Sequence, residues 1–336
     1  MIENTNIRAL AKALNLSIGT VSKALRNSHE ISAQTKEKVI ALAKELNYIP
    51  NPYASSLRRK KSNTIGVVIP EVADSFFSHA IKGIELIAQK KGYHVLVYLT
   101  YESFGKEEAI LKEFNSGRVD GVLLSLASET AKSNHIDSLA SKDIPLVFFD
   151  RVPDDKDTCK VSTNDFEICF DATNYLIEKG CRRPAYLSIS KHLSINRKRM
   201  EGFKKSIEKN KDKIKNSQII QCSNDNTKNY EIIKKAMQRR NSPDGIIASV
   251  EKLTTPVYLV CKDLNIAIPQ KLKVISFSNL ETAVILNPSL TTITQPAFEM
   301  GKKAAELLFK LIEKKKQQQK NEHVIIPSTL TVRAST

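Results

Sequence analysis

Apolar residues in the first fifty positions recur at helical spacing in three successive segments. Within each segment they lie three or four residues apart, as on one face of an α-helix. The three stripes are Ile7, Leu10, Ala11 and Leu14; Val21, Ala24 and Leu25; and Val39, Leu42, Ala43 and Leu46. This pattern predicts a helix-turn-helix at residues 7–25 and a third helix after it.

Polar residues mark the ends of these helices. Ser17 is placed to cap the second helix, and Ser32 precedes the third. Asn15, in the turn between the first two helices, and Asn47, after the third, are predicted to take a left-handed backbone conformation. Asn tolerates that conformation second only to Gly. Pro50 prevents the third helix from continuing.

Residues 51–61 predict a short basic helix. Asn51-Pro52 is a strong helix start, because the missing amide of Pro costs nothing at the first helical position. A helix of about two turns is marginal in water by itself. Leu57 stands at its exposed end, directly before four cationic residues. An apolar wedge beside a cationic cluster is typical of proteins that kink DNA through the minor groove. The alternative is a solvated linker between domains.

After Ser62 the pattern changes to alternating strands and helices. The expected elements are strands at 64–70, 93–99, 121–126 and 145–150 with a helix at 76–91, then helices at 165–179 and 195–210 with strands at 184–188, 245–248 and 274–277. Such alternation predicts doubly wound parallel sheets, and its restart after Val161 predicts two lobes. Ligands of such sheets bind at the carboxyl ends of the strands, here in the crevice between the lobes.

Length and charge narrow the class of protein. A chain of 336 residues is too long for one ordinary core, so two or three domains are expected. The net charge is +16, and residues 1–62 carry eleven Lys and Arg against four Glu. This balance favours a polyanionic partner, with nucleic acid as the first candidate. Charge alone is equally consistent with a basic but unspecialised soluble protein.

The sequence lacks the motifs of an enzyme. It contains no nucleophile elbow or phosphate-binding glycine loop, and its His residues show neither metal-ligand nor triad spacing. We therefore expect no catalytic residues, no cofactor and no metal. The five Cys show no CxxC spacing, which predicts reduced, buried thiols. A signal peptide and an apolar run of roughly 18 residues are both absent, which predicts a cytoplasmic protein without a membrane partner.

The second predicted helix is the candidate for reading DNA. In a helix-turn-helix its N-terminal residues reach base edges. Ile18 could contact a thymine methyl group, Lys23 could donate to guanine, and the amides after Ser17 suit phosphate. The expected DNA-binding residues are Ser17, Ile18, Gly19, Thr20, Ser22, Lys23 and Asn27, with Tyr53, Ala54, Leu57 and Arg58 in the short helix. The alternative is a plain three-helix bundle with a solvated polar face.

Residues 1–61 resemble the headpiece of the lac repressor (LacI/GalR) family. The matching residues are Ala11, Asn15 to Ser17 and Thr20 to Leu25, then Ser32, Thr35 and Val39, then Leu46 to Tyr48, Pro50, Asn51, Ala54 and Leu57. The resemblance implies that Leu57 is a minor-groove wedge and that a second subunit supplies another copy. The chain departs from the family at Asn15, where Gly is usual, and at Gly19 and Lys23, where other side chains read bases.

Residues 62–334 resemble the receptor of the same family, which is related to periplasmic sugar-binding proteins. Markers include Val119-Asp120-Gly121, Asp150-Arg151 and Phe277-Ser278-Asn279. The implied organisation is a helix-turn-helix domain at 1–50, a hinge helix and linker at 51–61, and an effector-binding domain at 62–336. The first lobe is expected at about 62–160 plus 291–320 and the second at about 161–290 plus 321–336. The helix at 298–313 should pack on the first lobe, and residues 323–333 should supply a final strand.

The expected effector-binding residues follow predicted strand ends or match the family. They are Asp74, Phe76, Phe77, Ser125, Asp150, Arg151, Arg199, Val250, Ser278 and Asn279. Arg199 resembles the family's effector-gripping arginine, and a guanidinium can donate in pairs to hydroxyls or to a carboxylate. The chain has Val250-Glu251 where relatives usually show Asn-Asp, and Ser278 where many have Asp. One cleft Arg combined with a missing Asp suggests an acidic ligand, such as a uronic acid or a sugar phosphate.

Together these patterns predict a sequence-specific DNA-binding regulator, expected to repress genes of carbohydrate metabolism. The expected partners are a pseudo-palindromic double-stranded operator, a small-molecule effector of the carbohydrate class and a second copy of the chain. A protein co-effector in place of the sugar is one alternative. A solute-binding protein without gene control and an α/β enzyme are two others, against which the headpiece and the missing catalytic motifs count.

Overall fold

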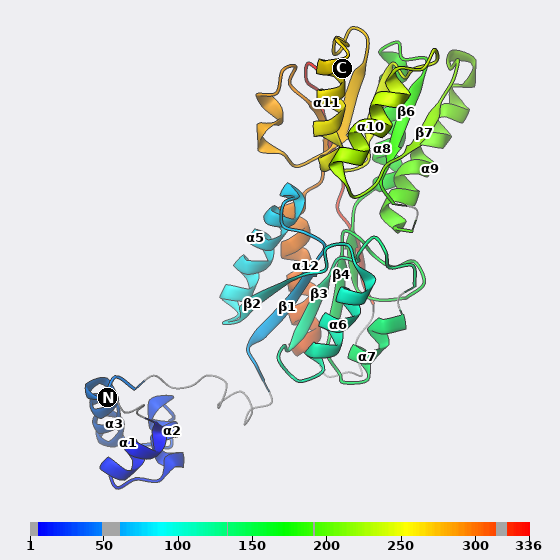
Figure 1. Cartoon of the computed structure of the whole chain (residues 1–336). Coiled ribbons are helices and arrows are strands. Elements are labelled where there is room, and N and C mark those ends of the chain that lie inside the picture. The colour runs from blue at the N-terminus through cyan, green and yellow to red at the C-terminus, as the bar shows by residue number, and fades with distance from the viewer. Residues whose placement is uncertain (1–5, 49–60, 133, 191, 314–320) are drawn as a thin grey trace. The chain divides into compact units, whose positions relative to one another are not determined.

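The computed structural model describes residues 6–48, 61–132, 134–190, 192–313 and 321–336, and the chain divides into two units between Lys60 and Lys61. The first unit, here called the headpiece, contains helices α1 (Ile7–Ala13), α2 (Ile18–Leu25) and α3 (Ala33–Glu45) (Figure 1). Its core consists of Leu10, Ala11, Val21, Ala24, Val39 and Ala43. The three predicted helices are therefore present, and most of each predicted stripe faces the core, although Leu46 at the end of the third stripe is 37% exposed.

Each headpiece helix ends on an asparagine with left-handed backbone. Asn15, Asn27 and Asn47 have φ angles of 52°, 55° and 50°. After each of them, the next amide donates to the carbonyl five residues earlier at 2.8–3.0 Å. This Schellman arrangement satisfies carbonyls that the helix leaves unpaired. The left-handed conformations of Asn15 and Asn47 are confirmed, and Asn27 has the same structural role.

The second unit consists of two lobes, each built on a six-stranded sheet. The first sheet runs β11-β5-β4-β3-β1-β2 and the second β12-β10-β9-β8-β6-β7. All pairs are parallel except that of β10 with β12. The first sheet contains β1 (Thr64–Ile69), β2 (His94–Leu99), β3 (Gly121–Leu124), β4 (Leu146–Phe149), β5 (Lys160–Ser162) and β11 (His323–Ile325). The second contains β6 (Pro184–Ser188), β7 (Gln218–Gln221), β8 (Gly245–Ala248), β9 (Lys273–Phe277), β10 (Thr291–Thr294) and β12 (Thr329–Thr331).

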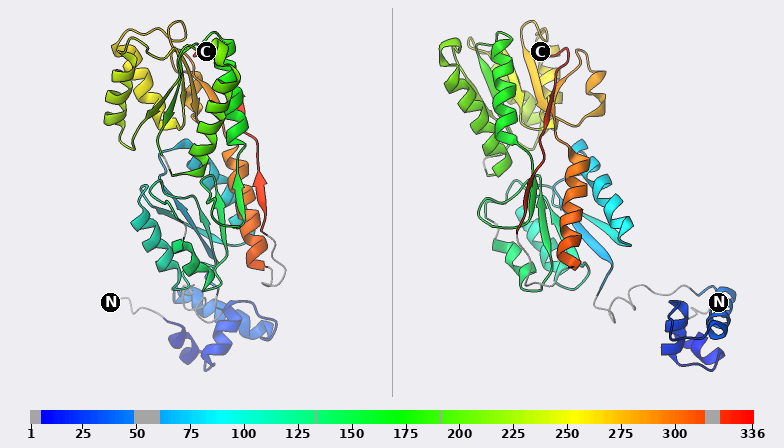
Figure 2. Two further views of the ribbon diagram at one scale, coloured as in Figure 1. Left: turned by 90° about the vertical axis from the view of Figure 1, so that its right-hand side faces the viewer. Right: turned by 180° about the vertical axis from the view of Figure 1, so that it is seen from behind.

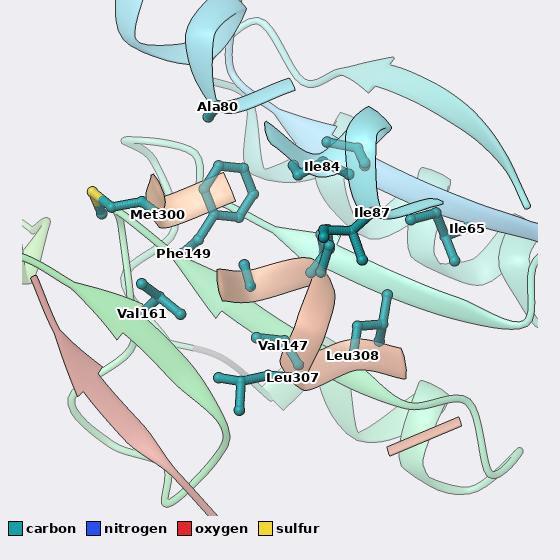
Figure 3. Close-up of a cluster of buried hydrophobic side chains, with 14 of the residues drawn as sticks. Ile65, Ala80, Ile84, Ile87, Val147, Phe149, Val161, Met300, Leu307 and Leu308 are labelled. Carbon is teal, nitrogen blue, oxygen red and sulfur yellow. The ribbon is translucent and has the colours of Figure 1, made fainter. Parts of the chain in front are cut away.

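Helices cover both faces of each sheet, as predicted for doubly wound folds. In the first lobe α5 (Ser75–Lys90) and α12 (Ala297–Glu313) share one face, while α6 (Phe104–Phe114) and α7 (Asp137–Ala140) lie on the other. In the second lobe α8 (Asp165–Glu178) and α9 (Ser194–Lys209) form one layer, and α10 (Asn226–Met237) and α11 (Thr254–Asp263) the other. Figure 3 shows the core beneath α5 and α12, where Ile84, Phe149 and Leu308 come from three different elements.

The structure corrects the expected lobe boundaries. Residues 291–294 form β10, which pairs with β9 and β12 and so belongs to the second sheet. The chain returns to the first lobe only after Gln295. A single strand was expected at 323–333, but this segment forms two strands, β11 in the first sheet and β12 in the second. Figure 2 shows this red C-terminal segment passing from one lobe to the other. A strand's residue pattern indicates burial, but it does not indicate which sheet offers the partners for its backbone.

Two helix pairs approach closely at glycines. A Cβ atom on Gly301 of α12 would lie 2.0 Å from the carbonyl oxygen of Ala80 on α5, and one on Gly202 of α9 would lie 2.2 Å from that of Phe166 on α8. Both distances are shorter than any Cβ contact, so the helices can pack this way only around glycine. All five cysteines are buried, and no described helix is long and apolar enough to cross a bilayer.

Gly301→Ala should destabilise the protein, because the new methyl group forces α5 and α12 apart. The expected loss in free energy of unfolding is about 1–3 kcal/mol, from overpacking. Gly105→Ala is the matched control, since a Cβ there would meet only Ser103 Oγ, at 3.9 Å. Denaturant unfolding of both variants checks this. A Gly301→Ala protein as stable as Gly105→Ala would contradict the close helix packing.

Candidate functional site

The N-terminal end of α2 presents a mixed polar and apolar surface. Ser17 caps the helix, and its Oγ accepts from the amide of Thr20 at 3.0 Å and lies 2.9 Å from Thr20 Oγ1. Ile18 is 46% exposed, although it is a large apolar residue. Ser22 is half-buried, and its carbonyl accepts from Arg26 Nε at 2.9 Å. An exposed Ile beside free helix amides is suited to apolar contact with a base next to phosphate contacts.

Gly19 has no structural reason to be glycine. A Cβ atom at this position would meet only Ser17 Oγ, at 3.6 Å, which is ordinary contact. Glycine inside a helix is less stable than alanine by about 1 kcal/mol. Among the described residues of the headpiece, no contact explains why this position is glycine.

Lys23 is held by an acidic neighbour. Its Nζ donates to Glu30 Oε2, and this hydrogen bond with the Lys23 charge lowers the pKa of Glu30. A contact between Lys23 and DNA would therefore require Lys23 to leave Glu30. Asn27 terminates α2, so its backbone conformation explains the residue without DNA. The predicted contacts Tyr53, Ala54, Leu57 and Arg58 lie outside the described residues.

In the second unit, nine of the ten expected effector residues line one cavity between the lobes. The first lobe contributes Asp74, Phe76 and Phe77 at the start of α5 and Asp150 and Arg151 after β4, and the second contributes Arg199, Val250, Ser278 and Asn279. Ser125 is not among the lining residues; it is fully buried after β3, where its amide donates to Val68 O. The cavity measures about 40 Å³, room for about three waters. A sugar therefore needs side chains or lobes to move.

Sequence reasoning missed eight lining residues. They are Ile189, Leu193, Ile195, Asn196, Ser249, Glu251, Phe277 and Gln295. Ser249, Glu251 and Phe277 lie at or just beyond strand ends, so the rule that found their neighbours also applies to them. Gln295 follows β10, which was expected to lie at the crossing to the first lobe. Asn196 lies in the first turn of α9, where no strand end indicates a site.

Arg199 is fixed in the second lobe with one donor group left over. Its Nε donates to Asp165 Oδ1 at 2.8 Å and its Nη1 to the carbonyl of Ser249 at 2.7 Å. The guanidinium lies over the ring of Phe277, 3.7 Å from its centroid. Nη2 is buried and has no hydrogen-bond partner among the described residues. A buried donor without a partner is costly, and a ligand acceptor would satisfy it.

The first lobe holds a second guanidinium that is already neutralised. Arg151 Nη1 donates to both carboxylate oxygens of Glu102, at 2.9 and 2.7 Å, and the pair is buried. The neighbouring Asp150 has a left-handed φ of 61° and accepts from Gln295 Nε2 at 3.0 Å. Such strained residues persist where surrounding contacts hold them and are frequent in binding sites.

The charges of the cleft do not support the argument for an acidic ligand. That argument depended on Arg199 as a single cleft cation, yet Arg199 is paired with Asp165 as Arg151 is with Glu102. Asp74, Asp150 and Glu251 add carboxyl groups to the same cavity. Burial, and then the charge of Glu251, raise the pKa of Asp74 to about 7. Acceptor-rich walls of this kind suit hydroxyl donors better than anions.

Asp74 should make stability depend on pH. Its folded-state pKa of about 7 exceeds the value of about 3.9 of an unfolded Asp. Folding therefore takes up a proton between these values, and stability falls as pH rises from about 4 to 7. Asp74→Asn should remove this contribution. The free energy of unfolding of Asp74→Asn, relative to that of the wild type, should therefore increase as pH rises from about 4 to 7.

Denaturant unfolding at pH 5, 6, 7 and 8 measures the effect. Asp225→Asn is the control, since Asp225 also caps a helix, α10, but at an exposed end. Asn and Asp are equally good caps. A constant difference between Asp74→Asn and the wild type at all four pH values would rule out the raised pKa.

Comparison with known proteins agrees with both units. The model of bacterial regulatory proteins of the lacI family matches residues 6–51, and that of periplasmic binding protein-like domains matches residues 173–336. The ribose operon repressor of Halalkalibacterium halodurans is 30% identical over 332 residues, 99% of this chain and 97% of that protein.

Solved structures share the fold. The lac repressor dimer bound to operator and the anti-inducer ONPF has a TM-score of 0.84, at 20% identity over 99% of both chains. A LacI family transcriptional regulator from Enterococcus faecium with bound ribose has a TM-score of 0.71, at 24% identity over 81% of this chain and 98% of that one. With 30% identity to a relative along almost its entire length, this chain belongs to the lacI family of bacterial regulatory proteins, which are DNA-binding transcriptional regulators and not enzymes.

Proposed function

We propose that the protein is a homodimeric repressor of carbohydrate genes that binds a pseudo-palindromic operator and is controlled by a neutral sugar in the cleft between its lobes. The observation that carries the proposal is the combination, in one chain, of an exposed α2 N-terminus and a cavity lined by paired guanidiniums and extra carboxyl groups. A regulator of chromosomal genes acts in the bacterial cytoplasm.

On DNA, the start of α2 enters the major groove. Ile18 contacts a thymine methyl group, and Lys23 leaves Glu30 to donate to guanine. Gly19 lets the helix approach closely, while Ser17, Thr20 and Ser22 position the helix on phosphates. Leu57, with Tyr53, Ala54 and Arg58 beside it, acts in the minor groove, and two subunits on two half-sites require a pseudo-palindrome.

In the cleft, sugar hydroxyls donate to Asp150 and Asp74, and Arg199 Nη2 donates to a ring or hydroxyl oxygen. Phe76 and Phe77 supply apolar surface, and Val250, Ser278 and Asn279 contact the sugar from the second lobe. Arg151 holds the first-lobe carboxylates in place. The sugar controls the headpiece only through its difference in affinity between lobe arrangements, where tenfold corresponds to about 1.4 kcal/mol.

Lys23→Ala should weaken binding to the preferred operator by about 1–3 kcal/mol, because one guanine contact is lost. Glu30→Gln is the matched control: it frees Lys23 and removes a negative charge from the DNA-facing side, so affinity should hold or rise. Selection of operators from a random DNA library gives the preferred sequence, and titration with that operator gives the affinity of each variant. If Lys23→Ala selects the same operator with the same affinity as the wild type, Lys23 does not read a base.

Arg199→Lys should abolish the response to the sugar while operator affinity stays unchanged. Lysine keeps the positive charge beside the buried Asp165 but lacks the Nη2 donor, and a hydrogen bond from a charged group is worth about 1.5–3 kcal/mol. Ribose is the first probe, because the most similar repressor named above belongs to a ribose operon. Calorimetry and ribose-dependent operator release measure the effect.

Arg183→Lys serves as the control, since Arg183 pairs with Asp244 and is not part of the cavity lining. An Arg199→Lys protein that releases its operator at the wild-type ribose concentration would exclude Arg199 as the residue that holds the effector. If no sugar binds either protein, the effector is a different molecule, and a protein co-effector gains support.

A further inference from the structure

Glu251 is the most highly coordinated side chain of the cleft. Its Oε1 accepts from the amide of Ser75 at 3.2 Å, and its Oε2 accepts from Ser75 Oγ. The same Oε2 accepts from Ser278 Oγ at 2.7 Å and from the amide of Asn279 at 3.0 Å. Four donors thus converge on one carboxylate, and hydrogen bonds to a charged acceptor are about twice as strong as neutral ones.

These four donors come from both lobes. Ser75 is the first residue of α5 in the first lobe, whereas Ser278 and Asn279 follow β9 in the second. Glu251 itself begins the 3-10 helix η3 (Glu251–Leu253), with two residues between it and the end of β8 in the second lobe. The carboxylate therefore joins the two lobes at the carboxyl ends of their strands, where ligands of such folds bind.

Glu251 also lines two cavities, here called inner and outer. The inner one, of about 40 Å³, contains Arg199 and Asp150. The outer one measures about 640 Å³ and is lined by residues that include Lys252 and Tyr258. Asp74 and Glu251 line both. The inner cavity is too small for a sugar ring as it stands, while the outer one is large enough for a ligand of ordinary size.

We propose that Glu251 is an intramolecular latch: without effector its carboxylate holds the lobes together across the cleft, and the effector enters by displacing it. The proposal rests on the effector site proposed above. Displacement joins the two cavities and frees four donors, to which hydroxyl oxygens of a polyol bind. Glu251 is thus a specificity-determining residue, because the sugar must offer acceptors to Ser75, Ser278 and Asn279 at once.

A nearby carboxyl group keeps the latch displaceable. Glu251 lies close enough to Asp74 to raise its pKa. The charges of Arg151 and Asp150, which follow β4, act on the same group, Arg151 lowering its pKa and Asp150 raising it. Ionised Asp74 repels the Glu251 carboxylate, so the latched state is less stable than its four hydrogen bonds alone would make it. A neutral sugar removes this repulsion when it takes the place of Glu251.

Other polar contacts also join the lobes. Two are buried: Ser194 Oγ donates to the carbonyl of Val152 at 2.6 Å, and Gln295 Nε2 donates to Asp150 Oδ1 at 3.0 Å. Further contacts lie nearer the surface. Lys252 Nζ lies 3.2 Å from Glu71 Oε1, and Asn224 Nδ2 donates to Ser128 Oγ at 3.2 Å. The Lys252–Glu71 pair is partly exposed, and ion pairs of this kind contribute about 1 kcal/mol or less. Glu71→Gln therefore removes a charged inter-lobe contact without touching the latch, which makes it the matched control for Glu251→Ala.

The distance between the lobes tests the latch directly. Spin labels on Ser116→Cys, after α6, and Gln238→Cys, after α10, would report it in the full-length protein without DNA or sugar. Both positions are exposed, and the five native cysteines are buried, so labelling is selective. Glu251→Ala should add a population with a longer distance and lower the ratio of closed to open molecules about tenfold or more, as expected for losing one charge-assisted hydrogen bond.

Glu71→Gln should show the wild-type distances. Glu251→Gln keeps the size of the side chain and one acceptor oxygen, so its ratio of closed to open molecules should fall between those of the wild type and Glu251→Ala. Because Gln has nearly the shape of Glu, this variant is also expected to fold normally. If Glu251→Ala and Glu251→Gln both keep the wild-type distance distribution, the latch is excluded.

Ribose titration by calorimetry separates a latch from a ligand contact. If Glu251 competes with the sugar, Glu251→Ala should bind ribose about tenfold more tightly, because the fraction of competent molecules rises. Weaker binding by Glu251→Ala would overturn the proposal, since it would make Glu251 a group that holds the sugar. Absence of ribose binding in every variant would count against the proposed sugar, while the distance measurement would still decide on the latch.

Discussion

The rest of the site depends on the need to pair every charge that is buried between the lobes. A guanidinium or carboxylate without a partner in such a place costs several kcal/mol, so each lobe neutralises its own. Arg199 binds Asp165 within the second lobe, and Arg151 binds Glu102 within the first. The lobes can therefore separate without leaving these charges unpaired. Of the side chains that do reach across the cleft, Glu251 accepts the most hydrogen bonds, and its charge becomes solvated when the lobes part.

Much of this arrangement follows from the sequence. The helix stripes, the left-handed Asn15 and Asn47, and the two parallel sheets were predictable, because burial periodicity and backbone preference act locally. Seven of the nine predicted cavity residues were found by one geometric rule, namely that parallel strands present their carboxyl ends at the same edge, whereas Arg199 and Val250 came from comparison with the family pattern. Ser125 satisfies the rule and still lies outside the cavity lining, because its side chain is buried within the first lobe.

What the sequence did not show depends on contacts between distant segments. Glu251 stood out only as a departure from the family pattern, since its four donors come from residues 75, 278 and 279. The charge balance of the cleft also depends on distant segments. Arg199 alone suggested an acidic ligand, whereas pairing of Arg199 with Asp165 and of Arg151 with Glu102 is the basis for the neutral sugar that we propose. The sheet that receives β10 was likewise decided by backbone partners far along the chain.

The same contacts limit how strongly an effector can act. A sugar that enters by breaking four hydrogen bonds gains only the difference between its own contacts and those of Glu251. On this proposal, its affinity should be modest for the number of hydrogen bonds that it makes and its selectivity high, because an analogue that lacks one acceptor leaves a buried donor unpaired. The unpartnered Nη2 of Arg199 adds a contact that Glu251 does not make. In the proposed mechanism that extra donor tips the balance toward the sugar, so binding would require both release of the latch and capture by Arg199.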